Sequence, residues 1–155
     1  MKGFHAAIDG HVVNILPPVD INGGVSSDVI DMGKHGHVTF IIQGGVTAAA
    51  STLKVQACDD FVPTTPTDMA FTIYKEETAS EDTLGAAVAV AAAGVALSAN
   101  NSIFYVVELD AAELAAGFEK VRLNFSDPSG VTFYSAVAIL SGSRYGKEQS
   151  GTVIA

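Results

Sequence analysis

The sequence predicts a single all-β domain, an antiparallel β-sandwich or jelly roll of about eight strands with one short helix. Three observations support this fold class. The dominant hydrophobic period is two, turn-forming residues separate the apolar runs, and strand patterns do not alternate with helix patterns as they do in parallel α/β folds. At 155 residues the chain is long enough to bury a core without disulfides or metals.

Alternation of apolar and polar residues places the strands. Strand 119–125 shows the pattern well, because its apolar residues stand at every second position and charged or amide residues stand between them. Strands 102–109 and 131–140 are apolar on both faces, so we expect them to lie centrally and to meet another subunit. In 86–92 the composition also allows a helix, but alternation and the flanking glycines favour a strand. We expect strands over residues 27–32, 37–43, 52–58, 70–77, 86–92, 102–109, 119–125 and 131–140.

The one expected helix covers residues 110–116. Asp110 and Glu113 have the spacing of a capping box, and Gly117 is well placed as a left-handed stop. Further along, Asp127-Pro128-Ser129-Gly130 has the composition of a β-turn, with proline at the second position.

The two flanks do not have the pattern of sandwich strands. We expect residues 1–24 to form an N-terminal arm, 25–142 the sandwich domain, and 143–155 a C-terminal arm. Paired prolines keep the first segment extended and cannot donate to a central sheet. The alternative is an edge strand with a frayed tail. The residues expected to bind a partner are Val12, Ile15, Leu16, Pro17, Pro18, Arg144, Tyr145, Val153 and Ile154.

The charge of the chain argues against two kinds of partner. Its formal net charge is -9, with 8 Lys and Arg against 17 Asp and Glu. Phosphate backbones and anionic lipids repel such a chain, so we expect neither nucleic-acid nor membrane binding. No apolar run approaches the roughly 18 residues of a membrane span, and the N-terminus lacks the continuous apolar region of a secretory signal. We therefore expect a soluble product made in the cytoplasm.

Side chains suited to catalysis or metal binding are scarce. The single cysteine, Cys58, precedes two aspartates, Asp59 and Asp60, which disfavour a thiolate. His35 and His37 could approach one metal ion, but no recognised spacing supplies a third ligand, so we favour a solvated turn. Neither Asp59-Asp60 nor the acidic segment 76–82 alternates its oxygens as calcium loops do. We expect no enzymatic activity, no cofactor and no metal site.

Three segments carry a resemblance to a known family: Leu16 to Gly24 (LPPVDINGG), His37 to Gln43 (HVTFIIQ) and Tyr134 to Tyr145 (YSAVAILSGSRY). They resemble tailed-phage capsid decoration (cement) proteins with a jelly-roll or sandwich body, and the likeness spans most of the chain. The resemblance implies a homotrimer on the outer capsid surface, between capsomers, with the major capsid protein as its partner. It implies no active-site residues.

The sequence thus predicts a structural virion protein that stabilises contacts between capsid subunits. A glycan-binding or adhesion module is one alternative, although the chain has no Trp to form a sugar platform. A tail or connector component is another, and it would assemble with six-fold symmetry instead of as a trimer.

Overall fold

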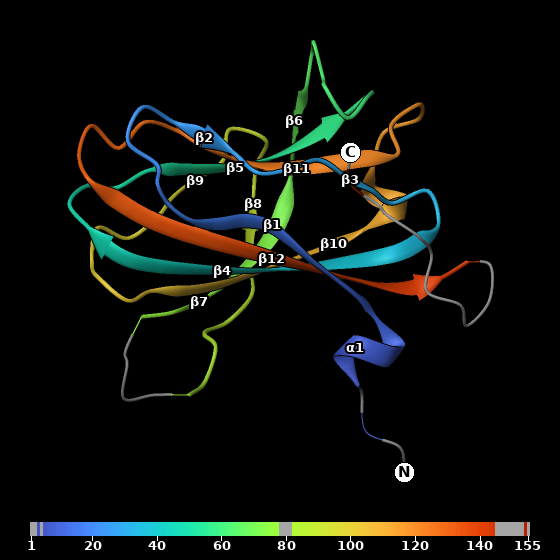
Figure 1. The fold of residues 1–155 in the computed structure, drawn as a ribbon, viewed down its shortest axis with the longest axis horizontal. Helices are drawn as coiled ribbons and strands as arrows, with labels where there is room; N and C mark the ends of the chain where they lie inside the picture. The colour runs from blue at the N-terminus through green and yellow to red at the C-terminus, as the bar shows by residue number, and fades with distance from the viewer. Residues whose placement is uncertain (1–2, 4, 78–81, 145–153, 155) are drawn as a thin grey trace.

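The computed structural model describes residues 3, 5–77, 82–144 and 154. Two antiparallel sheets stack face to face, which confirms the predicted all-β, sandwich-like fold (Figure 1). In spatial order, sheet A contains β1 (His11–Asp20), β12 (Thr132–Ser143), β4 (His35–Thr47), β10 (Phe104–Asp110), β7 (Phe71–Glu76) and β8 (Val88–Val90). Sheet B contains β2 (Val25–Ser26), β11 (Lys120–Phe125), β5 (Thr52–Cys58) and β6 (Thr67–Met69); β3 (Ile30–Asp31) also pairs with β11, and β9 (Val95–Ala96) with β5.

The hydrophobic core lies between the two sheets. Phe40 and Ile42 of β4 and Leu53 of β5 are fully buried, as the period of two predicts. Phe125 of β11 stacks on Tyr134 of β12, with ring centroids 5.5 Å apart, so this aromatic pair joins one sheet to the other.

The predicted strands match the structure best where alternation is strong. Strand 52–58 has the same bounds as β5, and the two strands with two apolar faces flank β4 in the middle of sheet A. Of the expected strand 27–32 only Ile30–Asp31 (β3) forms, and β2 ends just before it at Ser26. Ser27 still bonds to β11 through the Leu123 carbonyl, but the Asp28 amide donates to the Ile15 carbonyl of β1, which interrupts the pairing. The short strands β6 and β9 were not predicted, since two or three residues carry too little periodicity.

The structure corrects the expectation of a separate arm for residues 11–20. This segment is β1, an edge strand of sheet A paired with β12 along its length. Pro17 and Pro18 are tolerated because an edge strand needs no donor on its open side. The register shifts between Asn14 and Leu16, and again between Leu16 and Val19, so the prolines lie in an irregular part of the ladder.

The helical segments are shorter than expected. In place of a helix over 110–116, the chain forms one 3-10 turn, η1 (Ala111–Glu113), because Leu114 already has an extended backbone. The predicted capping contact is present: the Glu113 carboxylate accepts a hydrogen bond from the Asp110 amide at 2.7 Å. Gly117 has the predicted left-handed conformation, with φ of 94°. A short helix that was not predicted, α1 (Ala6–Asp9), precedes β1.

The C-terminal flank is described only in part. The backbone amide of Arg144 donates to the carbonyl of Lys34 at 2.9 Å, so the chain stays beside β4 past the end of β12. Ile154 is partly buried against the core. Tyr145 and Val153 lie outside the described residues. No helix within the described residues is long and apolar enough to cross a membrane.

Candidate interaction face

The pairing of strands in sheet A brings aliphatic side chains from distant parts of the chain into one row. Asn14 pairs with Val137, Val137 with Ile41, Ile41 with Val106, and Val106 with Tyr74. Apart from the exposed Lys75 beside Tyr74, their neighbours along each strand are buried in the core, so these side chains point away from sheet B. The row crosses five adjacent strands, and only Asn14 is an amide.

Two further rows lie on either side of the first. On one side Val12, Ile139, Thr39, Glu108 and Thr72 succeed one another, and on the other side Ser135, Gln43, Phe104 and Glu76 do so. We call the surface formed by the three rows, together with the outward side chains at their ends, the outer face of sheet A. Its residues are Val12, Asn14, His37, Thr39, Ile41, Gln43, Thr72, Tyr74, Glu76, Phe104, Val106, Glu108, Asp110, Phe133, Ser135, Val137, Ile139 and Ser141.

The carboxylates of the outer face of sheet A lie on one side of it, whereas its apolar side chains lie on both. Five aliphatic or aromatic residues come from β1, β12 and β4, among them Val12 and Phe133 with exposed fractions of 49% and 42%, and three come from β10 and β7, namely Phe104, Val106 and Tyr74. The carboxylates Glu108, Asp110 and Glu76 all come from β10 and β7. None of the residues of this face is Lys or Arg. The described helical turns are three and four residues long, too short to cover a sheet (Figure 1).

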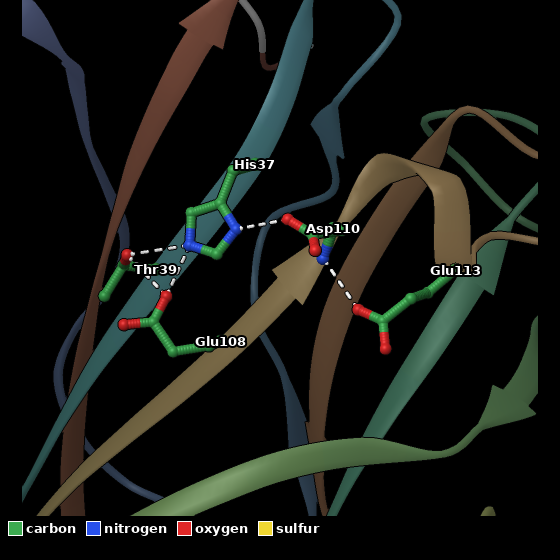
Figure 2. A network of polar contacts seen from close by, with 5 residues as sticks. All are labelled: His37, Thr39, Glu108, Asp110 and Glu113. Atoms are coloured by element: carbon green, nitrogen blue, oxygen red, sulfur yellow. Dashed lines mark hydrogen bonds and ion pairs between the residues drawn. The ribbon is translucent and has the colours of Figure 1, made fainter.

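A polar network joins β4 to β10 at one end of this face (Figure 2). The two ring nitrogens of His37 contact carboxylates on either side, Nδ1 at 2.7 Å from Asp110 and Nε2 at 2.5 Å from Glu108. The Thr39 hydroxyl donates to the same Glu108 carboxylate at 2.9 Å. Burial lowers the pKa of His37, but the hydrogen bonds to Asp110 and Glu108 outweigh it and raise this pKa above 6.5.

The network differs from the metal site that the histidine pair could have formed. His35 is buried, with its ring centroid 6.2 Å from that of His11, while both nitrogens of His37 contact carboxylates. Within the described part of the chain, no three His, Cys, Asp or Glu side chains are arranged to hold a metal ion.

The outer side of sheet B has a different character. Asp68 of β6 accepts hydrogen bonds from Lys54 at 2.5 Å and from Gln56 at 2.8 Å, and Arg122 donates to Gln56 at 2.9 Å. Asn124 of β11 donates to Ser26 at 3.0 Å. Polar side chains on this side therefore bind one another across β2, β11, β5 and β6.

A pocket of about 380 Å³ lies beside η1, near Met32 and Phe118. Its charged side chains, Asp59, Glu119, Lys120 and Arg144, are two acids and two bases. No Ser, Cys or His is among the described residues that line it.

The residues predicted to bind a partner are distributed unevenly. Val12, Pro17, Pro18 and Arg144 are exposed, and Val12 belongs to the outer face of sheet A. Ile15 and Leu16 are 1% and 5% exposed and belong to the core, so in this structure they present almost no surface to a partner. Ile41 and Tyr74, which are half-buried, and Val106, which is only 8% exposed, were not among the residues predicted to bind a partner. The apolar residues on the second face of strands 102–109 and 131–140 were the signal that pointed to this surface.

Comparison with known proteins gives little guidance. No family model and no curated protein matches this chain. Among solved structures, the chain is similar to the SPBc2 prophage-derived protein YomS, with 14% sequence identity and a TM-score of 0.45 over 84% of this chain and 93% of that one. Because identity and TM-score are both low, the match assigns neither a family nor a function.

Proposed function

We propose that this chain is a structural protein of a tailed-phage particle, a capsid decoration protein. In this proposal it binds the outer capsid shell as a homotrimer and stabilises contacts between neighbouring capsid subunits. The observation that carries the proposal is the outer face of sheet A. A surface rich in aliphatic and aromatic side chains, on a sheet that no other layer of the described residues covers, is typical of a protein–protein interface.

Two other features agree with this role. The net charge of -9 is compatible with the outside of a particle, away from the packaged genome. Segments 16–24, 37–43 and 134–145 carry the resemblance to decoration proteins, and two of them contribute to the outer face through Ile41 and Val137. Three linked copies would multiply a modest contact into firm attachment. No bond is made or broken in this mechanism.

The proposal is tested by measuring the copy number of this protein in purified virions together with its native mass. We expect trimers present at hundreds of copies, roughly the number that repeated shell positions provide. A few copies, or a six-fold ring, would contradict the proposal and favour a tail or connector component.

A matched pair of variants tests the surface itself. Val137→Lys places a charge on the outer face of sheet A, and Asn124→Lys places the same charge on the outer side of sheet B. We expect Val137→Lys to reduce the occupancy of particles by about ten-fold or more while Asn124→Lys leaves it near wild type. Equal occupancy of both variants would show that attachment uses another surface.

A further inference from the structure

The charged side chains on the outer face of sheet A are distributed asymmetrically, and this distribution constrains what can bind there. Glu76, Glu108 and Asp110 are its carboxylates, and His37 is its one group that can become cationic. The face is therefore net negative whether or not His37 is protonated. Glu76 makes no ion pair with any described residue, although it lies directly across from Phe104 at the border of the apolar rows.

The position of these carboxylates relative to the apolar centre is fixed by the strand order. Ile41 on β4 lies between Val137 and Val106, and the acidic strands β10 and β7 follow β4 on one side only. Neighbouring strands are about 4.8 Å apart, so Glu76 on β7 lies roughly 10 Å across the sheet from the β4 backbone. A complementary surface would need its positive charge at a similar offset from its own apolar centre.

A second copy of this chain does not meet that requirement through the same face. Two such faces in contact would place these carboxylates opposite carboxylates or, in the reversed orientation, opposite the apolar side chains of β1 and β12, and neither face supplies a Lys or Arg to neutralise them. On the outer side of sheet B, by contrast, Asp68 has Lys54 as its own partner. The carboxylates on sheet A thus select against self-association and for a partner that brings cations.

We propose that the outer face of sheet A binds a foreign protein surface in which an apolar strip is bordered on one side by Lys or Arg side chains. This inference rests on the proposed function and names the chemistry of the shell surface that would receive the protein. Aliphatic contacts over β12 and β4 supply the burial, and basic side chains over β10 and β7 set the orientation. Contacts between copies in a trimer then use other surfaces.

The test uses two synthetic peptides, one alternating Val with Lys and the other alternating Val with Glu, added to the isotopically labelled full chain. We expect the Val/Lys peptide to shift amide resonances of β4, β10 and β7, and the Val/Glu peptide to shift none of them. Raising the salt concentration should weaken the Val/Lys shifts. Failure of the Val/Lys peptide to shift these strands, or equal shifts from both peptides, would overturn the proposal.

A matched pair of double variants separates local charge from net charge. Glu76→Gln with Glu108→Gln removes two carboxylates from the outer face of sheet A, and Asp59→Asn with Asp60→Asn removes two from the exposed loop after β5. The first pair should weaken binding of the Val/Lys peptide roughly five-fold, and the second by less than about two-fold. Equal weakening would mean that only the net charge matters, which would overturn the proposal.

Analytical ultracentrifugation of the wild type and of Ile41→Lys tests whether a second copy of the chain binds to the outer face of sheet A. An oligomer unchanged by Ile41→Lys supports the inference, and an oligomer that Ile41→Lys dissociates overturns it. These measurements use no virus particles, so their failure is distinguishable from a failure of the proposed capsid role, which depends on copy number in virions.

Discussion

The two sheets of this sandwich are built by the same alternation and yet present opposite surfaces to their surroundings. On sheet B, Lys54, Gln56, Asp68 and Arg122 satisfy one another across three strands, so that side is suited to water. On sheet A eight of the eighteen outward residues are aliphatic or aromatic, and the carboxylates lie along one side without Lys or Arg. The period of two therefore locates the core, while the residues on the other face of each strand determine whether the outer surface of its sheet is polar or partly apolar.

The largest expected effect on stability comes from comparing an inward and an outward side chain of the same strand, β4. Ile42 is fully buried, and its neighbour Ile41 lies on the outer face of sheet A. We expect Ile42→Ala to lower the free energy of unfolding by about 2–5 kcal/mol, because it leaves a cavity in the core. Ile41→Ala should cost about 1 kcal/mol or less, the range of a cross-strand contact. Urea denaturation measures both, and equal losses would mean that Ile41 is part of the core.

A smaller effect is expected from the polar side of sheet B. Hydrogen bonds from Lys54 and Gln56 lower the pKa of Asp68 below 3.8. Its carboxylate therefore stabilises the fold above that pH, and this contribution is lost as the pH falls through the lowered pKa of the folded state. Asp68→Asn should reduce stability at neutral pH by about 0.5 kcal/mol, given the partial exposure of the pair, and flatten the loss of stability in acid.

Asp59→Asn is the control for that experiment, because Asp59 is an exposed carboxylate that makes no ion pair with any described residue. Unfolding curves at neutral and acid pH compare the two variants. If Asp68→Asn and the wild type lose stability equally as the pH falls, the polar network on sheet B contributes no measurable free energy to folding.

The smallest effect concerns the His37 network on sheet A. Because the folded-state pKa of His37 is raised, its charged form stabilises the fold fully below about pH 6.5 and loses this contribution as the pH rises through the raised value. His37→Gln should remove that dependence, changing stability by about 0.3 kcal/mol since all three side chains are partly exposed. Thermal melts from about pH 6 to about pH 9 measure it. His5→Gln, at an exposed histidine outside the sheets, should keep the wild-type profile.

Much of the fold could be predicted because its signals are local. Alternation gave the bounds of β5 and the buried side of β11, and the capping contact between Asp110 and Glu113 spans only three residues. The edge strand β1 was harder. A proline pair is equally compatible with a free arm and with an edge strand, and only the register with β12 shows that Ile15 and Leu16 are buried.

The candidate site depended on information that one sequence does not contain. His37 and Glu108 are 71 residues apart in the chain, and nothing local to either indicates the other. The row from Asn14 to Tyr74 depends on the order of five strands and on their register, both of which follow from packing of the whole chain. Sequence patterning showed that β10 and β12 have two apolar faces, but it could not show that these faces adjoin across β4.

The irregular pairing of β1 has a consequence for how the protein behaves at high concentration. An apolar sheet that ends in a flat, open strand is a template for strand-by-strand fibre growth. Pro17 and Pro18 remove two amide donors from this strand, and the two register shifts interrupt any regular ladder that an incoming chain could extend. The prolines and the two register shifts therefore disfavour the addition of another strand at this edge of sheet A.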